Sequence, residues 1–353
     1  MTETHEDRAP TECGRRFDEV LERLGRASSV VITTHANADG DGAGSEVALA
    51  AFLRERGAEA WIVNPTPFPA TFDFLLPERE WVLPPRSARE ARYCGEADLA
   101  VVLDTAQFPR IGRVKSLIRH LPKVVIDHHP PSDRPIDGLV VCDTSACATG
   151  ALVFELIDRA GGPWPEAVAR ALYVAVMTDT GGFRFSNTDR DCFRVAARLV
   201  ELGAVPEALF RAVYGRFRVR RFELLREALA TLTVHAGGRI AWMTVPKDAY
   251  DRVAATVDDL EGFVDVPRDI EGVQVAMLFR TTADGRIKVS LRSVPPIDVG
   301  RVATGFGGGG HARAAAAVVT GPLGDVIARV LGRVERLVDE QGAAPSVSIL
   351  RSR

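Results

Sequence analysis

Short apolar runs alternate with helix-like stretches in the N-terminal part of the chain. The β-branched run at 29–34 is followed by helical spacing of apolar residues at 44–56, and further apolar runs occupy 97–103 and 123–126. A helical stripe at 15–25 precedes the first run. Continuous apolar strands that alternate with helices are typical of a parallel sheet covered on both faces. We therefore expect an α/β fold with a Rossmann-like parallel sheet in this part.

The pattern changes twice further along the chain. It becomes almost purely helical, with helices expected at 146–160, 165–178, 189–202 and 205–233. Beyond Gly237-Gly238 it favours strands, expected at 239–245, 273–280 and 286–291, before a glycine run and a last helix at about 324–340. We expect an N-terminal domain at 14–215, a helical linker at 216–236 and a smaller α/β domain at 237–341. The stretches 1–12 and 342–353 are expected to be loose tails.

Composition and charge narrow the classes of function. With 353 residues, 46% hydrophobic and 26% charged, the chain can bury a large core, which excludes a disordered or fibrous protein. Lys and Arg number 44 against 47 Asp and Glu, so a broad basic surface for long nucleic acid is not expected. The five cysteines form no Cys-x-x-Cys pair, which argues against a structural zinc site and fits a cytoplasmic protein. We expect neither a signal peptide nor a membrane span.

Candidate metal ligands gather directly after the expected strands. These residues are His35, Asp39, Asp41, Asp104, Asp127, His128 and His129. Because the carboxyl ends of parallel strands meet at one crevice, we expect the side chains to converge there. A single aspartate after a strand is often only a helix cap or turn residue, but so many together favour one site.

The chemistry of this set indicates phosphoester hydrolysis. Carboxylates with imidazoles and no thiolate suit Mn²⁺, and also accommodate Mg²⁺, Co²⁺ or Zn²⁺. The ligands are too many for one ion, and a carboxylate such as Asp104 can bridge two cations that lie about 3.5–4 Å apart. Such a pair can activate a hydroxide and hold phosphate oxygens during in-line displacement. Asp179, between an apolar helix and Gly181-Gly182, is a further acidic candidate or a C-terminal turn residue.

Two features of the C-terminal part could bind an anion. The run Gly307–Gly310 can present backbone N–H groups to an anion or a base, with His311 as a side-chain donor; alternatively it is a hinge loop. Arg292, at the end of an expected strand, can grip phosphate with two hydrogen bonds, or is simply solvated.

At these residues the sequence resembles the DHH phosphoesterase superfamily, and within it the nanoRNase branch that carries a DHH-associated C-terminal domain. The resemblance covers about residues 17–317. It rests on four ordered N-terminal motifs, at 35–45, 103–104, 127–129 and 178–181, and on the C-terminal segments 289–293 and 307–311. Two positions depart from the family pattern: Ala38 stands where Pro is common, and Ala316 ends the glycine motif where Gly is common. Neither departure removes a functional side chain, although Ala316 puts the fit of substrate near His311 in question.

The resemblance implies two divalent ions, Mn²⁺ above all, and a role for each motif residue. One ion would be held by His35, Asp39 and Asp104, and the other by Asp41, Asp104, His128 and Asp179. His129 would face the substrate phosphate, oriented by Asp127. The residues implied to bind substrate are Ser290, Arg292, Gly308, Gly309, Gly310 and His311.

The expected function is therefore manganese-dependent hydrolysis of very short RNA to mononucleotides, and of 3′-phosphoadenosine 5′-phosphate (PAP). A cyclic di-AMP phosphodiesterase would use the same motifs and stays open as the alternative. A RecJ-type exonuclease is disfavoured because there is no basic excess, and an inorganic pyrophosphatase because the glycine-rich motif differs. A metal-free nucleotide sensor would lack ligands that this chain retains. The sequence leaves a homodimer open.

Overall fold

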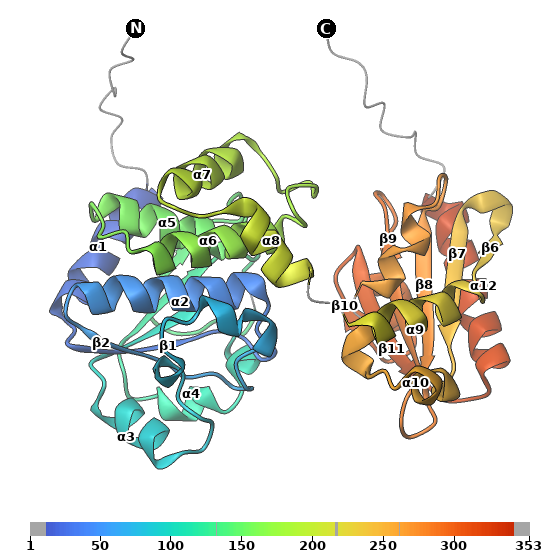
Figure 1. Cartoon of the computed structure of the whole chain (residues 1–353), viewed down its shortest axis with the longest axis horizontal. Helices are drawn as coiled ribbons and strands as arrows, with labels where there is room; N and C mark the ends of the chain where they lie inside the picture. Colours follow the sequence, from blue (N-terminus) through green and yellow to red (C-terminus); the bar gives the residue numbers. More distant parts are fainter. Residues whose placement is uncertain (1–11, 132, 216–217, 261, 342–353) are drawn as a thin grey trace, which may run out of the picture. The chain divides into compact units, whose positions relative to one another are not determined.

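The computed structural model describes residues 12–131, 133–215, 218–260 and 262–341. It divides into two compact units, residues 1–216 and 217–353, which are drawn in Figure 1. Of the expected tails at 1–12 and 342–353, residues 1–11 and 342–353 lie outside the described residues, whereas Glu12 begins a helix. None of the helices in the described part has the length and apolar character needed to cross a membrane.

Unit 1 is built on a parallel five-stranded sheet with strand order β2-β1-β3-β4-β5. The strands are β1 (Ser29–Thr33), β2 (Glu59–Ile62), β3 (Leu99–Leu103), β4 (Lys123–Asp127) and β5 (Leu139–Cys142). All neighbouring pairs run parallel, which confirms the expected fold class. The central strands β1, β3 and β4 match the expected apolar runs, whereas the short outer strands β2 and β5 were not expected.

Helices cover both faces of this sheet, as the buried apolar runs require. They are α1 (Glu12–Arg26), α2 (Gly40–Glu55), α3 (Ala88–Glu96), α4 (Val114–Leu117), α5 (Thr149–Arg159), α6 (Glu166–Asp179), α7 (Arg190–Glu201) and α8 (Pro206–Tyr214). Short 3-10 turns lie at Ala70–Leu75, Arg79–Trp81 and Phe108–Ile111. Figure 1 shows α2, α5 and α6 on one side of the sheet and α3 and α4 on the other. Alternate strand residues accordingly enter two separate cores, Val30 and Ile32 on the α2 side and Val31 on the α3 side.

Unit 2 contains a mixed sheet of order β10-β11-β9-β8-β7-β6, in which only the β7–β8 pair is parallel. The strands are β6 (Thr233–His235), β7 (Ile240–Val245), β8 (Val275–Thr281), β9 (Ile287–Ser293), β10 (Gly309–Gly310) and β11 (Ala314–Val319). The helices are α9 (Val219–Leu229), α10 (Lys247–Val253), α11 (Gly300–Thr304) and α12 (Leu323–Gln341), with 3-10 turns at Ala236–Gly238, Val257–Leu260, Phe263–Asp265 and Pro267–Asp269. One face of the sheet packs on α12 and the other on α9 and α10.

The expected single helix at 205–233 is wrong. Helix α8 ends at Tyr214 and α9 begins at Val219, and the β-branched pair Thr233-Val234 forms β6 instead. Gly215 closes α8 by donating its N–H to the carbonyl of Arg211. The segment expected as a linker thus contributes α9 and β6 to unit 2, where β6 pairs with β7.

Candidate metal centre

The ends of three parallel strands bring the N-terminal motifs together. His35 follows β1, Asp104 follows β3, and Asp127 is the last residue of β4, with His128 next to it. Asp104 adopts φ = 59°, a backbone conformation that is uncommon outside glycine and that marks functional sites. The expected convergence of the three motifs is therefore found in unit 1.

Helices α2 and α6 bring the remaining carboxylates into the same place. Asp39 caps α2, since its side chain accepts hydrogen bonds from the N–H groups of Asp41 and Gly42, both at 3.1 Å. A Cβ at Gly44 would overlap the carbonyl of Ala171 on α6, so glycine is needed for the two helices to pack this closely. This packing sets Asp41, near the start of α2, beside Asp179, at the end of α6.

The first group of candidate ligands is His35, Asp39 and Asp104. Nε2 of His35 lies 3.2 Å from Oδ2 of Asp104 and 3.6 Å from Oδ2 of Asp39. The other ring nitrogen, Nδ1, lies 2.9 Å from the carbonyl of Ala36 and donates to it. Nε2 is therefore the atom that faces the two carboxylates.

The second group is Asp41, His128 and Asp179. Nε2 of His128 lies 3.7 Å from Oδ2 of Asp41, 3.7 Å from Oδ2 of Asp179 and 3.8 Å from Oδ1 of Asp104. Its Nδ1 lies 3.2 Å from the carbonyl of Ala146. Asp104 thus turns one oxygen toward each group, Oδ2 toward His35 and Oδ1 toward His128.

The backbone and side chains around the second group were not anticipated from the sequence. Asp41 accepts hydrogen bonds from the N–H groups of Thr149, at 2.7 Å, and Gly150, at 2.8 Å, at the start of α5. Thr149 also donates its hydroxyl to Oδ1 of Asp104, and Asn187 donates its amide to Oδ2 of Asp179 at 3.2 Å. Backbone donors leave no signature in residue types, so no pattern in the sequence indicated these contacts.

The charges of the site favour a cation. Burial together with the charges of Asp104 and Asp179 raises the pKa of Asp41 well above its usual range. Burial and the neighbouring aspartates likewise raise the pKa of Asp179 to about 6. Burial lowers the pKa of His35, but the carboxylates of Asp104 and Asp39 outweigh it and raise that pKa to about 10. Without a metal ion, these side chains therefore hold an extra proton at the place where a metal cation would bind.

Two orphaned nitrogen atoms test whether the residues fit a metal ion. Among the residues that the structure describes, Nε2 of His35 and Nε2 of His128 are buried and have no hydrogen-bond partner. Buried polar atoms without a hydrogen-bond partner are rare. Each of these two Nε2 atoms faces carboxylates, while Nδ1 of the same ring lies at hydrogen-bond distance from a backbone carbonyl. This is the arrangement by which proteins orient a histidine ligand. The residues fit divalent metal binding in both groups.

His129 and Asp127 form a pair beside these groups. Oδ1 of Asp127 accepts from Nδ1 of His129, at 2.8 Å, and from its backbone N–H, while Oδ2 accepts from the N–H of Ala106. The hydrogen bond to Asp127 raises the pKa of His129. Burial raises the pKa of Asp127, but the hydrogen bonds from His129 outweigh it and leave that pKa lowered. Asp127 therefore orients the imidazole of His129, whose Nδ1 lies 3.6 Å from Oδ1 of Asp104.

In unit 2 the expected substrate-binding residues lie on or next to β9 and β10, the two strands that flank β11. Ser290 and Arg292 lie two residues apart on β9, on one face of the sheet, and Ser290 pairs with Ala316 of β11. Gly309 of β10 pairs with the same Ala316 from the other side. Nε of Arg292 lies 3.6 Å from Oδ1 of Asp265, so its guanidinium is partly compensated within unit 2.

The glycine run differs from the expected open loop. Gly309 and Gly310 form the edge strand β10, and the N–H groups of Gly308 and His311 already donate to the carbonyls of Ala303 and Ala314. A Cβ at Gly308 would overlap the carbonyl of Ala316. A Cβ at Gly310 would likewise overlap the carbonyl of Ala314, whereas a Cβ at Gly309 would meet nothing within 4 Å. Gly308 and Gly310 therefore permit close packing on β11.

Comparisons with known proteins agree with this arrangement. Residues 29–176 match the DHH family, N-terminal domain, and residues 245–340 match the DHHA1 domain. The chain is 32% identical over 322 residues to the bifunctional oligoribonuclease and PAP phosphatase NrnA of Thermus thermophilus, covering 89% of this chain and 91% of that protein. It superposes with a TM-score of 0.84 on an exopolyphosphatase-related protein from Bacteroides fragilis, at 27% identity, covering 92% of this chain and 98% of that one.

Two further likenesses concern proteins with other named activities. The chain is 25% identical over 315 residues to the cyclic-di-AMP phosphodiesterase GdpP of Geobacillus thermodenitrificans, covering 84% of this chain and 45% of that protein. It superposes with a TM-score of 0.52 on RecJ of Thermus thermophilus in complex with Mn²⁺, at 15% identity, covering 96% of this chain and 56% of that one. The latter likeness is one of fold.

Proposed function

This chain belongs to the DHH family of hydrolases, and we propose that it cleaves phosphoester bonds in very short oligoribonucleotides and in PAP with two divalent metal ions. The similarity to a bifunctional oligoribonuclease and PAP phosphatase over nearly the whole chain supports the choice of substrates. The observation that carries the proposal is the pair of orphaned imidazole nitrogens, each facing carboxylates, with the two oxygens of Asp104 turned toward different groups.

In this proposal His35, Asp39 and Asp104 hold one ion, and Asp104 shares the second with Asp41, His128 and Asp179. When bound, a pair of Mn²⁺ ions supplies a nucleophilic water and Lewis-acid stabilisation of phosphate charge. With both oxygens of Asp104 counted, these six side chains offer five oxygen donors and two nitrogen donors, and no thiolate. Such a set favours Mn²⁺ over softer ions.

The protein contributes orientation and positive charge. Asp127 fixes the ring of His129 through a hydrogen bond to Nδ1, which leaves Nε2–H available to donate to a phosphate oxygen. Thr149 and Gly150 hold both oxygens of Asp41 through their N–H groups, which positions that carboxylate without using side chains. Loss of either set of hydrogen bonds would shift the side chain of His129 or Asp41 without removing it.

Recognition of the rest of the substrate is assigned to unit 2. Ser290 and Arg292 lie on β9 and Gly308–His311 lie on and beside β10, with β11 between these two strands, and the guanidinium of Arg292 suits a phosphate. The net charge of −3 provides no extended electrostatic track, which supports short substrates over long strands.

A turnover assay with parallel substrates tests the proposal. Purified protein supplied with Mn²⁺ is given a linear RNA dinucleotide, PAP, cyclic di-AMP and pyrophosphate at equal concentrations. We expect turnover of the dinucleotide and PAP, and none with Asp104→Ala, while Asp133→Ala, an exposed carboxylate after β4, stays active. Preference for cyclic di-AMP would instead favour the activity named for the Geobacillus relative, and cleavage of pyrophosphate alone would refute the proposal.

A further inference from the structure

Two cysteines of unit 1 lie at the starts of two helices. Cys147 lies two residues before Thr149, the first residue of α5, and Cys192 lies in the first turn of α7. Both are free and buried, with exposed fractions of 3% and 1%. Together with Ala148 and Val176 they form a small hydrophobic cluster of their own, beside the two larger cores of this unit. Two cysteines that share one cluster can be cross-linked where their sulfur atoms face each other.

The thiols of this pair interact directly. A hydrogen bond between them raises the pKa of Cys147 and lowers the pKa of Cys192, so Cys147 is the donor and Cys192 the acceptor. The first turn of a helix also stabilises a thiolate, and Cys192 lies in the first turn of α7. Asp189 caps this helix through the N–H of Cys192, at 2.8 Å, and its charge opposes the thiolate only in part, since the pKa of Cys192 stays lowered. Cys192 is therefore the more nucleophilic of the two thiols.

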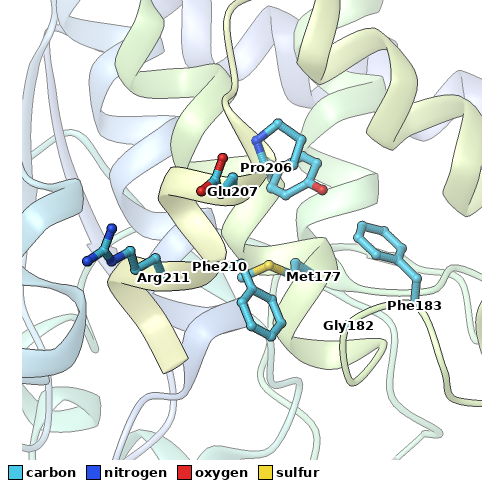
Figure 2. A pocket seen from close by; sticks show the side chains of 8 residues that line it. Met177, Gly182, Phe183, Pro206, Glu207, Phe210 and Arg211 are labelled. Carbon is cyan, nitrogen blue, oxygen red and sulfur yellow. The ribbon is translucent and has the colours of Figure 1, made fainter. Parts of the chain in front are cut away.

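A hollow gives small molecules a route toward the pair. It has a volume of about 410 Å³, and its lining includes Met177 of α6, Phe183, and Phe210 of α8. Figure 2 shows Phe210 and Met177 side by side with Phe183 across from them. The side chain of Phe183 also packs on the cluster that contains the two thiols. Buried thiols are ordinarily inert, but here a movement of one ring that borders both hollow and cluster admits a molecule as small as hydrogen peroxide.

Hydrogen bonds connect this pair to the second group of candidate metal ligands. The N–H groups that hold Asp41 belong to the residues two and three positions after Cys147. The carbonyl of Cys147 accepts a hydrogen bond from the amide of Asn187 at 2.8 Å, and the same amide donates to Oδ2 of Asp179 at 3.2 Å. Asn187 in turn lies five residues before Cys192. A displacement of the two cysteines therefore reaches the supports of Asp41 and Asp179 together.

We propose that Cys147 and Cys192 form a reversible disulfide when the protein meets hydrogen peroxide, and that this disulfide weakens metal binding by the second group. The thiolate of Cys192 attacks one oxygen of the peroxide, the O–O bond breaks, and a sulfenic acid and a hydroxide ion result. The hydroxide takes up the proton that Cys192 has lost. The sulfur of Cys147 then gives up its proton and displaces the hydroxyl group of the sulfenic acid, which forms the S–S bond and releases water. Two electrons pass from the sulfurs to the peroxide, which ends as two molecules of water.

Closing this bond draws the starts of α5 and α7 toward each other, because bonded sulfurs lie closer than two thiols in contact. The N–H groups that follow Cys147 then shift relative to Asp41. Supports of this kind are worth about 10–100-fold in metal affinity. The first group, with His35 and Asp39, has no such connection to the pair among the described hydrogen bonds. Formation of the disulfide is independent of the proposed function, whereas its consequence for turnover rests on it.

Oxidation of the full chain, followed by two separate readouts, tests the proposal. Reduced, metal-free protein is treated with hydrogen peroxide, and catalase then destroys the excess. One portion is alkylated and digested, and mass spectrometry identifies cross-linked peptides. The other portion is used to measure bound Mn²⁺ by equilibrium dialysis and turnover of a dinucleotide at the same Mn²⁺ concentrations. Cys147→Ser and Cys192→Ala each remove one partner, Cys94→Ser at another buried free cysteine is the matched control, and circular dichroism verifies folding.

We expect a cross-link between Cys147 and Cys192 in the wild type and in Cys94→Ser. Binding of the second Mn²⁺ ion should then need an about 10–100-fold higher concentration, and dithiothreitol should reverse the shift. Neither Cys147→Ser nor Cys192→Ala should show the cross-link or the shift. No cross-link at peroxide concentrations that oxidise the exposed Cys142 would overturn the proposal, as would a cross-link that leaves Mn²⁺ binding unchanged. The cross-link and the shift in a protein that turns over no substrate would support the disulfide and contradict the proposed function alone.

Discussion

Removing the carboxylate of Asp104 should harm the metal centre more than removing any other ligand. Its Oδ2 lies 3.2 Å from Nε2 of His35 and its Oδ1 lies 3.8 Å from Nε2 of His128, so this one side chain serves both groups. Changes in residues that merely support a ligand cost about 10–100-fold in metal affinity. Losing a direct ligand at two ions should cost at least about 100-fold in affinity, or roughly 2.7 kcal/mol, and about 10,000-fold, or roughly 5.5 kcal/mol, if the two losses multiply.

The comparison with Asp179→Ala isolates the sharing of Asp104. Asp179 belongs to the second group alone, so its loss should weaken one ion and leave the other bound. Metal content by mass spectrometry and turnover of a dinucleotide, measured on the same samples over a range of Mn²⁺ concentrations, separate the two variants. Two bound ions and a near-normal rate in Asp104→Ala would refute the shared carboxylate.

Replacing Asp104 by asparagine should change how the stability of the protein responds to metal. The charge of Asp104 contributes to the raised pKa of both Asp41 and Asp179, which means that the carboxylates repel one another when no cation is present. Asp104→Asn keeps an oxygen acceptor for Thr149 and removes this charge. Mn²⁺ should therefore raise the Tm of the wild type, whereas it should leave the Tm of Asp104→Asn nearly unchanged. A large rise with Mn²⁺ in both proteins would count against the reasoning.

Two other predictions concern unit 2 and the core of unit 1. Arg292→Ala and His311→Ala should leave metal content unchanged and raise KM for a dinucleotide, with a smaller effect on KM for a minimal non-nucleotide phosphodiester. Equal losses of activity on both substrates would instead show that these residues take part in the chemical step. Glu46 is fully buried and accepts a hydrogen bond from Asn64, and burial raises its pKa to about 8. Because the folded state holds this proton more tightly than the unfolded chain, the contribution of Glu46 is present below about pH 4.5 and is lost as pH rises toward 8, by an amount on the order of a few kcal/mol. Glu46→Gln should remove this loss of stability with rising pH. In urea titrations its free energy of unfolding should therefore change less between pH 5 and 8 than that of the wild type. Parallel plots of the free energy of unfolding against pH for the two proteins would contradict the assignment.

The sequence predicts the central part of the fold and the convergence of the motifs because both follow from continuous apolar runs. Strands β1, β3 and β4 are buried along their whole length or nearly so and read clearly, and their carboxyl ends place His35, Asp104 and Asp127 together. Strands β2 and β5 are only four residues long and partly exposed, so no pattern marks them.

Other features could not be predicted because they depend on contacts between distant segments. The N–H groups of Thr149 and Gly150 reach Asp41 across 108 and 109 residues, and only the packing of α2 against α5 and α6 brings them there. The glycine run was expected as an open anion-binding loop, whereas pairing with β11 makes it an edge strand. The end of the helical segment at Leu229 likewise reflects the pairing of β6 with β7, which competes with helix formation at 233–235.

Hydrolysis rates on a ladder of RNA lengths test the central claim most directly. The ladder runs from the dinucleotide upward, kcat/KM is measured with Mn²⁺ at each length, and Asp104→Ala serves as the blank. The account predicts the highest kcat/KM for the shortest substrates and a steep fall beyond a few residues, because nothing in the charge of this chain holds a long strand. Equal or rising kcat/KM for long strands would contradict it and would identify a processive exonuclease instead.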